Sequence, residues 1–312
     1  MIRIAIFSKR QQVFRGLIIF FLLGSGLPIQ SQPPAQEPVD QMKALEDSLH
    51  RTAMRIIEPR NDEERLLNNE VFMGLLRESL LADSTLLQTF TGVRTASFLK
   101  DPRGQFRIVT WYVPFVDGTF RYFGFFQTIA QSDQAGALHF LNDISNQEKD
   151  FSNLELSMEN WYGAFYQELI HTRRRGIDQY ILLGWKGNDR ITRKRVIEPL
   201  QITPEGPVFG AQVFDGGVDE PHRIIFEHSA RVSMSLHFYD EFRIRRRKSR
   251  VIVFDRLIPM RQGQEGNFSY YVPEVNIFDG YRYSRGRWIF TPDLDTRVFI
   301  DPSLVPLNPA TR

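Results

Sequence analysis

Residues 184–189 form the segment whose residue types could most directly contact a ligand, Gly-Trp-Lys-Gly-Asn-Asp. Trp185 offers an aromatic face for stacking, and Asp189 offers a carboxylate for a ligand or for Ca²⁺. A Ca²⁺ loop needs several oxygen ligands at alternating positions, and only Asn188 and Asp189 are obvious here. Glycine and asparagine also tolerate positive φ, which is typical of an ordinary hairpin turn. The pattern favours the turn and leaves Trp185 and Asp189 as candidate ligand-binding residues.

Two clusters of basic residues could bind an anion. Arg173 and Arg175 belong to the first cluster, and Arg245 and Arg247 belong to the second, within residues 243–250. Arginine makes paired hydrogen bonds to phosphate or carboxylate, which suggests a receptor for lipopolysaccharide phosphate or an acidic polysaccharide. Alternating charge is equally typical of the solvated face of a strand that enters a turn, and charge runs are usually solvated. The sequence favours the solvated face and keeps these four arginines as candidate ligand contacts.

Histidines near residue 228 raise the possibility of a metal or hydrolase site. His222 and His228 share one face of an expected strand, whereas Glu227 lies on the other face, and His237 comes later. Ser229 follows His228 directly, and neighbouring strand residues point to opposite faces, so these two side chains do not form a catalytic pair. The chain also lacks HExxH and G-x-S-x-G motifs. Ordinary surface or hydrogen-bonded histidines are therefore expected.

Pairs of carboxylates could serve a glycosidase. The candidate pairs are Asp255 with Glu274 and Glu159 with Glu168. Sequence does not give their separation in space, and solvated surface carboxylates are the default. We therefore assign no catalytic residue, expect no metal site, and expect no cofactor.

Two helices are predicted before any strand. Met42, Leu45, Leu49, Ala53 and Ile56 recur at steps of three and four residues, and Glu58-Pro59 ends this helix. A second helix is expected to start near residues 61–62, with acidic residues in its first turn. Its predicted apolar face is formed by six residues: Leu67, Val71, Leu75, Phe72, Leu76 and Leu80. We expect Leu67, Val71 and Leu75 to be buried against the following domain, and a short helical turn at residues 86–87.

Near residue 98 the spacing of apolar residues changes from three or four residues, as in a helix, to two residues, which indicates strands. The aromatic content is high, with 26 Phe, 10 Tyr and 4 Trp, and such residues favour sheet. Asp117-Gly118, residues 172–176 and residues 284–286 are expected hairpin turns. Residues 133–147 are the expected site of a single interrupting helix. The predicted strands cover residues 106–112, 119–127, 161–170, 179–185, 196–202, 223–227, 231–238, 250–256, 267–271, 278–283 and 288–290.

Short strands without long helices between them predict an α+β fold in which β-structure dominates. The expected architecture is an N-terminal helical hairpin (residues 40–98) followed by an antiparallel meander sheet domain (residues 99–312). A barrel, a sandwich and a small propeller all fit this pattern, and the lack of an internal repeat argues against the propeller.

The first 31 residues predict an export signal. Four basic side chains and no acidic ones precede the apolar run of residues 16–27, and a small residue precedes a polar stretch. The run is interrupted by Gly24, Gly26 and Pro28, so it suits a cleaved signal better than a spanning helix of about 20 apolar residues. Cleavage is expected between Ser31 and Gln32. Residues 32–39 are Pro-rich and predict an extended tether, and no transmembrane span is expected after cleavage.

Removal of this leader changes the charge balance. The full chain has 39 basic and 37 acidic residues, and the leader holds four of the basic ones, so the mature chain has a formal net charge of −2. No nucleic-acid partner is therefore expected. The chain has no cysteine, which excludes disulfides and an anchor on a lipidated N-terminal Cys. A mature chain of about 281 residues can nevertheless hold its fold by burial alone.

Several segments resemble an uncharacterised family of exported proteins from Bacteroidota. The most specific segment is YILLGWKGND at residues 180–189, within a resemblance that covers roughly residues 100–295. Other similar pieces are DGTFRYFGFFQ, RIIFEHSARVSMSL, VIVFDRL and FDGYRYSRGRWIF. The resemblance implies export and a β-rich body, and it implies no activity. Lys186 stands where an acidic residue is expected in that family, which argues against a cation loop.

Together these observations predict an exported protein of the periplasm, the outer membrane or the cell exterior. The leading interpretation is a non-enzymatic binding or assembly module whose partner is an anionic envelope component or another envelope protein. A hydrolase of envelope glycans or peptides, and a barrel-type carrier of an apolar ligand, are the alternatives. A pocket with convergent carboxylates or histidines favours the hydrolase, and a dry aromatic cavity favours the carrier.

Overall fold

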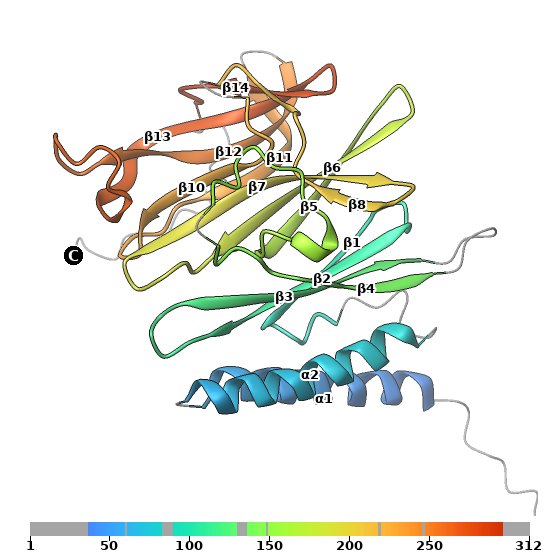
Figure 1. The fold of residues 1–312 in the computed structure, drawn as a ribbon. Helices are drawn as coiled ribbons and strands as arrows, with labels where there is room; N and C mark the ends of the chain where they lie inside the picture. Colours follow the sequence, from blue (N-terminus) through green and yellow to red (C-terminus); the bar gives the residue numbers. More distant parts are fainter. Residues whose placement is uncertain are drawn as a thin grey trace, which may run out of the picture.

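In the computed structural model the described part of the chain begins with two antiparallel helices and continues as three β-sheets (Figure 1). The structure describes residues 37–59, 61–82, 90–129, 136–147, 149–217, 220–244 and 247–295. The export signal, the expected turn at residues 86–87 and Arg245 lie outside these residues. The predicted β-dominant α+β class, with an N-terminal helical hairpin before antiparallel sheets, is confirmed.

The helices are α1 (Glu37–Ile57) and α2 (Asp62–Leu81). Helix α1 includes the last three residues of the stretch expected to be an extended tether, because a proline in the first helical turn costs no hydrogen bond. Helix α2 begins where predicted. The Asn61 side chain caps it by accepting a hydrogen bond of 2.8 Å from the Glu64 amide, which satisfies one of the helix's unpaired amide groups.

The predicted buried face of α2 is partly wrong. Leu67 is 61% exposed and Val71 is 54% exposed, whereas Phe72, Leu76 and Leu80 are fully buried. The helix is apolar on more than one side, so its spacing alone does not fix its rotation. A buried polar contact helps to fix it, since the Asn69 amide oxygen accepts a hydrogen bond of 2.7 Å from the indole of Trp111.

The strands form three sheets, within which all pairs except β14 with β9 are antiparallel. The first sheet has the order β1 (Ala96–Lys100), β2 (Phe106–Pro114), β3 (Phe120–Thr128), β4 (Ala137–Leu141). The central sheet has the order β10 (Ile224–Ser229), β7 (Thr192–Thr203), β6 (Ile177–Lys186), β5 (Phe165–Arg174), and β8 (Gly206–Phe209) pairs with β7. The third sheet has the order β11 (Leu236–Ile244), β12 (Arg247–Pro259), β13 (Tyr271–Ser284), β14 (Arg287–Thr291), β9 (Phe214–Asp215).

The helices and the three sheets are stacked as successive layers (Figure 1). Alternate residues of a strand face opposite sides, and on β2 Ile108 faces the central sheet while Trp111 faces the helices. On β6, Leu182 faces the first sheet and Leu183 faces the third sheet. Burial on both faces explains why these strands are continuously apolar in sequence. The strands of the described residues therefore form open, stacked sheets, as in a sandwich with an additional layer.

Three of the predicted elements are wrong. Residues 133–147 hold strand β4 and not a helix, because Ala137–Leu141 pairs with β3. Residues 267–271 begin as the short 3-10 helix η3 (Phe268–Tyr270), capped by the Asn267 side chain. The strand expected at residues 231–238 begins only at Leu236, since the preceding residues form a loop. That loop contributes to the candidate site.

Candidate anion-binding site

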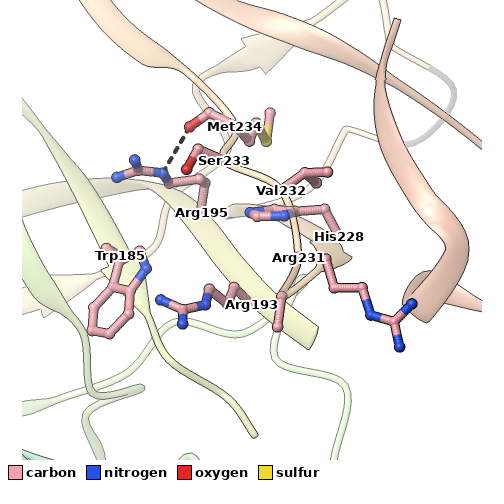
Figure 2. Close-up of a pocket in the computed structure, with 9 residues that line it drawn as sticks. Trp185, Arg193, Arg195, His228, Arg231, Val232, Ser233 and Met234 are labelled. Carbon is pink, nitrogen blue, oxygen red and sulfur yellow. Dashed lines mark hydrogen bonds between the residues drawn. The ribbon is translucent and has the colours of Figure 1, made fainter. Parts of the chain in front are cut away.

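A cavity of about 220 Å³ lies beside Trp185, at one end of the central sheet (Figure 2). Its charged lining consists of Arg193, Arg195 and Arg231, and the His228 ring forms part of the wall. The described residues that line it include no Asp or Glu. In Figure 2 the guanidinium groups of Arg193 and Arg195 lie toward Trp185, whereas the Arg231 side chain extends the other way. The cavity is therefore cationic with one aromatic wall.

Strand pairing brings these residues together. Residues directly opposite each other in an antiparallel pair share a face of the sheet. Trp185 of β6 lies opposite Arg195 of β7, and Arg193 of β7 lies opposite His228 of β10. Arg193 and Arg195 are two residues apart and so share that face as well. One face of three adjacent strands thus carries the aromatic ring, both arginines and the histidine.

The opposite wall is the loop that follows β10. The Ala230 amide donates a hydrogen bond of 2.8 Å to the Ile191 carbonyl, and the Val232 amide donates one of 3.3 Å to the Ser229 carbonyl. The Arg195 Nε–H donates a hydrogen bond of 3.1 Å to the Met234 carbonyl, so the arginine itself holds the loop in place. These bonds fix the loop in position without any ligand.

The cations of the site are not neutralised by ion pairs. Within the described part of the chain, none of Arg193, Arg195 and Arg231 has a carboxylate oxygen within 4.0 Å. Arg195 donates to Met234 and to the Gln167 side chain, at 2.7 Å, which leaves three of its five N–H donors for another partner. Burial lowers the pKa of Arg195, and the charge of Asp255 partly offsets this. The guanidinium stays charged at neutral pH.

His228 is neutral at physiological pH. Burial lowers its pKa, the charges of Arg195 and Arg193 lower it further, and a hydrogen bond to a carbonyl and the charge of Asp255 act in the opposite direction. Its Nδ1 lies 2.9 Å from the Ser229 carbonyl oxygen, which can only accept, so Nδ1 carries the proton. Nε2 of the neutral ring is then an acceptor. The histidine thus adds a polar wall and no charge.

The Trp185 ring is held from behind by other aromatic side chains. Its centroid lies 5.4 Å from Phe120 in an edge-on arrangement and 5.3 Å from Tyr112. The Arg193 guanidinium lies 5.9 Å from the Trp185 centroid, within reach of a cation–π contact. Rings packed in this way keep the indole in one orientation, so that it presents a fixed surface to the cavity.

A buried polar network lies under the site, on the opposite face of the central sheet. Lys186, the residue after Trp185, donates to the Ser145 hydroxyl at 2.9 Å, to the Tyr162 carbonyl at 3.0 Å and to the Gly163 carbonyl. Burial lowers the pKa of Lys186 to about 7, and the charge of Asp143 partly offsets this effect. These bonds anchor the end of β6, and with it the position of Trp185.

The second part of this network is a fully buried ion pair. The Arg223 Nε lies 2.6 Å from a Glu198 oxygen, and Tyr166 donates its hydroxyl proton to the same carboxylate. Arg223 also donates to the carbonyls of Phe151, Leu154 and Phe209. Two cations therefore satisfy carbonyl groups of the irregular segment between β4 and β5, which is packed against both sheets.

The structure places Trp185 at the cavity, and it gives Asp189 a local structural role. Asp189 Oδ1 accepts hydrogen bonds of 2.7 Å from the amides of Ile191 and Thr192, as in an ordinary Asx turn. Asn188 has a positive φ of 52° and donates to the Thr192 hydroxyl at 2.6 Å. Trp185 thus lies at the end of β6, before this turn, and Asp189 lies inside the turn. Of the two, only Trp185 lines the cavity.

The other predicted arginines lie away from this cavity. Arg175 occupies the two-residue turn between β5 and β6 with a φ of 49°, and Arg173 lies 3.7 Å from Asp178. Arg247 begins β12, and Arg245 is outside the described residues. The first residues of β6 contact the β13–β14 turn, because the Gln179 side chain donates to the Gly286 carbonyl at 3.2 Å. Within the described part of the chain, no hydrogen bond or ion pair joins the two predicted basic clusters.

Sequence reasoning missed Arg193, Arg195 and Arg231. The available signal was the alternation of Arg193 and Arg195 just before the strand predicted at residues 196–202. This alternation alone does not indicate a binding site. The site forms only because β10 and the loop after it lie beside β7, and that pairing is not visible in the sequence.

Three of the carboxylates considered for catalysis have other partners. Asp255 accepts a hydrogen bond of 2.7 Å from the Ser235 amide, and Glu274 lies 3.8 Å from Arg256. Glu227 lies 3.3 Å from Lys194 and accepts from the Thr192 hydroxyl. Among the described residues no group of three or more His, Cys, Asp or Glu side chains could hold a metal ion.

None of the described helices is long and apolar enough to cross a membrane. Comparisons with protein-family models, with curated proteins and with solved structures find no match to this chain.

Proposed function

We propose that this protein is a non-enzymatic binding module of the bacterial cell envelope, and that it binds an anionic group in the cavity beside Trp185. The observation that carries the proposal is that three arginines without carboxylate partners line one cavity with an aromatic wall, and that two of them, Arg193 and Arg195, lie toward Trp185. Unpaired guanidinium groups recognise phosphate and carboxylate through charge-assisted hydrogen bonds. Export follows from the leader sequence and from the family resemblance, and both remain predictions.

The local charge argues for a ligand. The mature chain is predicted to have a net charge of −2, so the cluster does not follow from an overall basic composition. Some other exposed arginines of the described residues do have a carboxylate partner, as Arg250 has Asp240 at 2.6 Å. Repulsion between Arg193 and Arg195 is relieved when an anion is bound between them.

The two alternative functions have less support. The described residues lining the cavities contain no Asp or Glu, so no pair of carboxylates is available there for hydrolysis. The cavity between α1 and the first sheet has a volume of only about 40 Å³, near the space of one water molecule. These three cavities thus hold no catalytic pair of carboxylates, and the one beneath α1 is too small for an apolar ligand.

Tryptophan fluorescence provides a direct test. Trp111, Trp161 and Trp288 are buried, so Trp185 is the one tryptophan of the four that a ligand can reach. We expect glucose 1-phosphate to change the fluorescence at low salt and glucose to have no effect. The response should weaken as salt rises, because exposed charges are screened over about 8 Å at physiological ionic strength.

Two charge-reversal variants distinguish binding in this cavity from binding at the predicted basic cluster of residues 243–250. Arg193→Glu is expected to abolish the glucose 1-phosphate response, whereas Arg247→Glu, which changes an exposed arginine outside the cavity, leaves it intact. Trp185→Phe should remove the signal while equilibrium dialysis still detects binding. An absent response at low salt, or equal binding by Arg193→Glu and the unchanged protein, would refute the proposal.

A further inference from the structure

A second cavity of about 530 Å³ adjoins the first, and Arg231 lines both. Its cationic lining is completed by Arg190 and Arg261. Arg231 extends away from Trp185 (Figure 2) and also lines this second cavity. The two cavities are therefore connected through one arginine, and together they present five arginine side chains along one surface.

The second cavity differs from the first in having exposed aliphatic side chains. Ile191 and Met260 line it and are each 62% exposed, and Tyr270 lines it and is 42% exposed. The nearby Phe268 of η3 is also exposed, at 43%. Large apolar side chains that gather beside unpaired cations commonly mark a contact with another molecule or with a membrane.

The backbone holds these apolar side chains next to the arginines. The Met260 amide donates a hydrogen bond of 3.0 Å to the Tyr270 carbonyl, which joins the end of β12 to η3. The Ile191 carbonyl accepts from Ala230, the residue directly before Arg231. The η3 segment also packs against β10, the strand that carries His228. The cationic and apolar side chains thus lie on one continuous surface, whose segments are joined by backbone hydrogen bonds.

We infer that the natural ligand is a phosphate-bearing lipid, with its phosphate on the arginines and its acyl chain on Ile191, Met260 and Tyr270. This inference rests on the proposed anion-binding function and specifies the ligand class. Charge complementarity selects the phosphate. The aliphatic side chains select an acyl chain, because a free sugar phosphate would leave them in water, and single-stranded nucleic acid is bound on successive aromatic rings.

The test is flotation with lipid vesicles, using the full mature chain. We expect binding at low salt to phosphatidylcholine vesicles that contain one-fifth phosphatidic acid, and none to vesicles of phosphatidylcholine alone. Arg193→Glu should lose this binding. The double variant Met260→Ser/Tyr270→Ser should bind the acidic vesicles roughly tenfold more weakly, since burial of one large apolar side chain has at least that effect.

Controls distinguish this inference from the proposed function. The double variant should keep its fluorescence response to glucose 1-phosphate, and Ile177→Ser, which removes an exposed isoleucine at the far turn of β6, should bind vesicles normally. If the unchanged protein responds to glucose 1-phosphate but does not bind the acidic vesicles, the lipid inference is refuted and the proposed anion-binding function is kept. Failure of both ligands refutes both ideas. Unchanged vesicle binding by the double variant, or tighter binding of a single-stranded oligonucleotide than of vesicles, also refutes the lipid.

Discussion

Replacing Arg223 by methionine should destabilise the protein strongly, because it leaves the buried Glu198 without its partner. Both side chains have no exposed surface. Methionine has a similar length but no N–H group, so Glu198 loses its ion pair and the carbonyls of Phe151, Leu154 and Phe209 lose a donor. The Tyr166 hydroxyl remains as the one described donor to this carboxylate.

Removal of one partner of a buried ion pair costs about 3–5 kcal/mol. For a chain of this size each kcal/mol lowers the melting temperature by roughly 2 °C, so Arg223→Met should lower it by about 6–10 °C. Glu198→Gln should have a comparable effect, since it leaves the guanidinium buried without a counter-charge. The double variant should cost less than the sum of the two, by about 1–3 kcal/mol, because it removes both charges together.

Urea denaturation of the four proteins, with melting curves alongside, measures these effects. Arg250→Met is the matched control, because its ion pair with Asp240 is largely exposed and should contribute under about 1 kcal/mol. A loss below about 1 kcal/mol in Arg223→Met, or strictly additive losses in the double variant, would show that the pair is not a coupled part of the core.

Three other predictions concern stability and processing. The folded pKa of Lys186 is about 7 against an ordinary value of 10.5, so the unfolded chain binds more protons between these values, and stability should rise by about 2 kcal/mol from pH 7 to pH 9. In Lys186→Met, urea titrations at these two pH values should show a smaller rise, and an equal rise in both proteins would contradict the assignment. Leu76→Ala should cost about 2–5 kcal/mol and Val71→Ala on the exposed side under about 0.5 kcal/mol in the same assay, and similar costs would mean that α2 is rotated differently. Mass spectrometry of the native envelope protein should find an N-terminus near Gln32, and an intact Met1 form would exclude cleavage.

The sequence predicted the elements whose signals are local. The hairpins around Asp117-Gly118 and residues 284–286 were found because strand alternation and turn residues lie within a few positions of each other. The start of α2 was found because the acidic first turn lies beside the capping residue. In each case the physical cause and the visible pattern occupy the same short segment.

The rotation of α2 and the location of the candidate site depend on contacts between distant segments. The Asn69–Trp111 hydrogen bond joins residues 42 positions apart, and no local sequence pattern predicts that these two residues pair. Arg193 meets His228 only because β10 returns to pair with β7 after the chain has passed through β8 and β9. The arginines of the two predicted basic clusters are close together in sequence, whereas those of the cavity are brought together by folding.

The placement of the cavity on the central sheet has a consequence for how its specificity can change. Arg193 and Arg195 project from β7, whose other face contributes Val196 and Leu200 to the core between the first and central sheets. The backbone under the arginines is therefore held by packing in which they take no part. Substitution of Arg193 can alter the size and charge of the accepted ligand while the scaffold keeps its shape, whereas Arg195 also holds the loop after β10 through its hydrogen bond to the Met234 carbonyl. A lineage could thus exchange one anion for another by a few point mutations, without insertions, deletions or loss of fold.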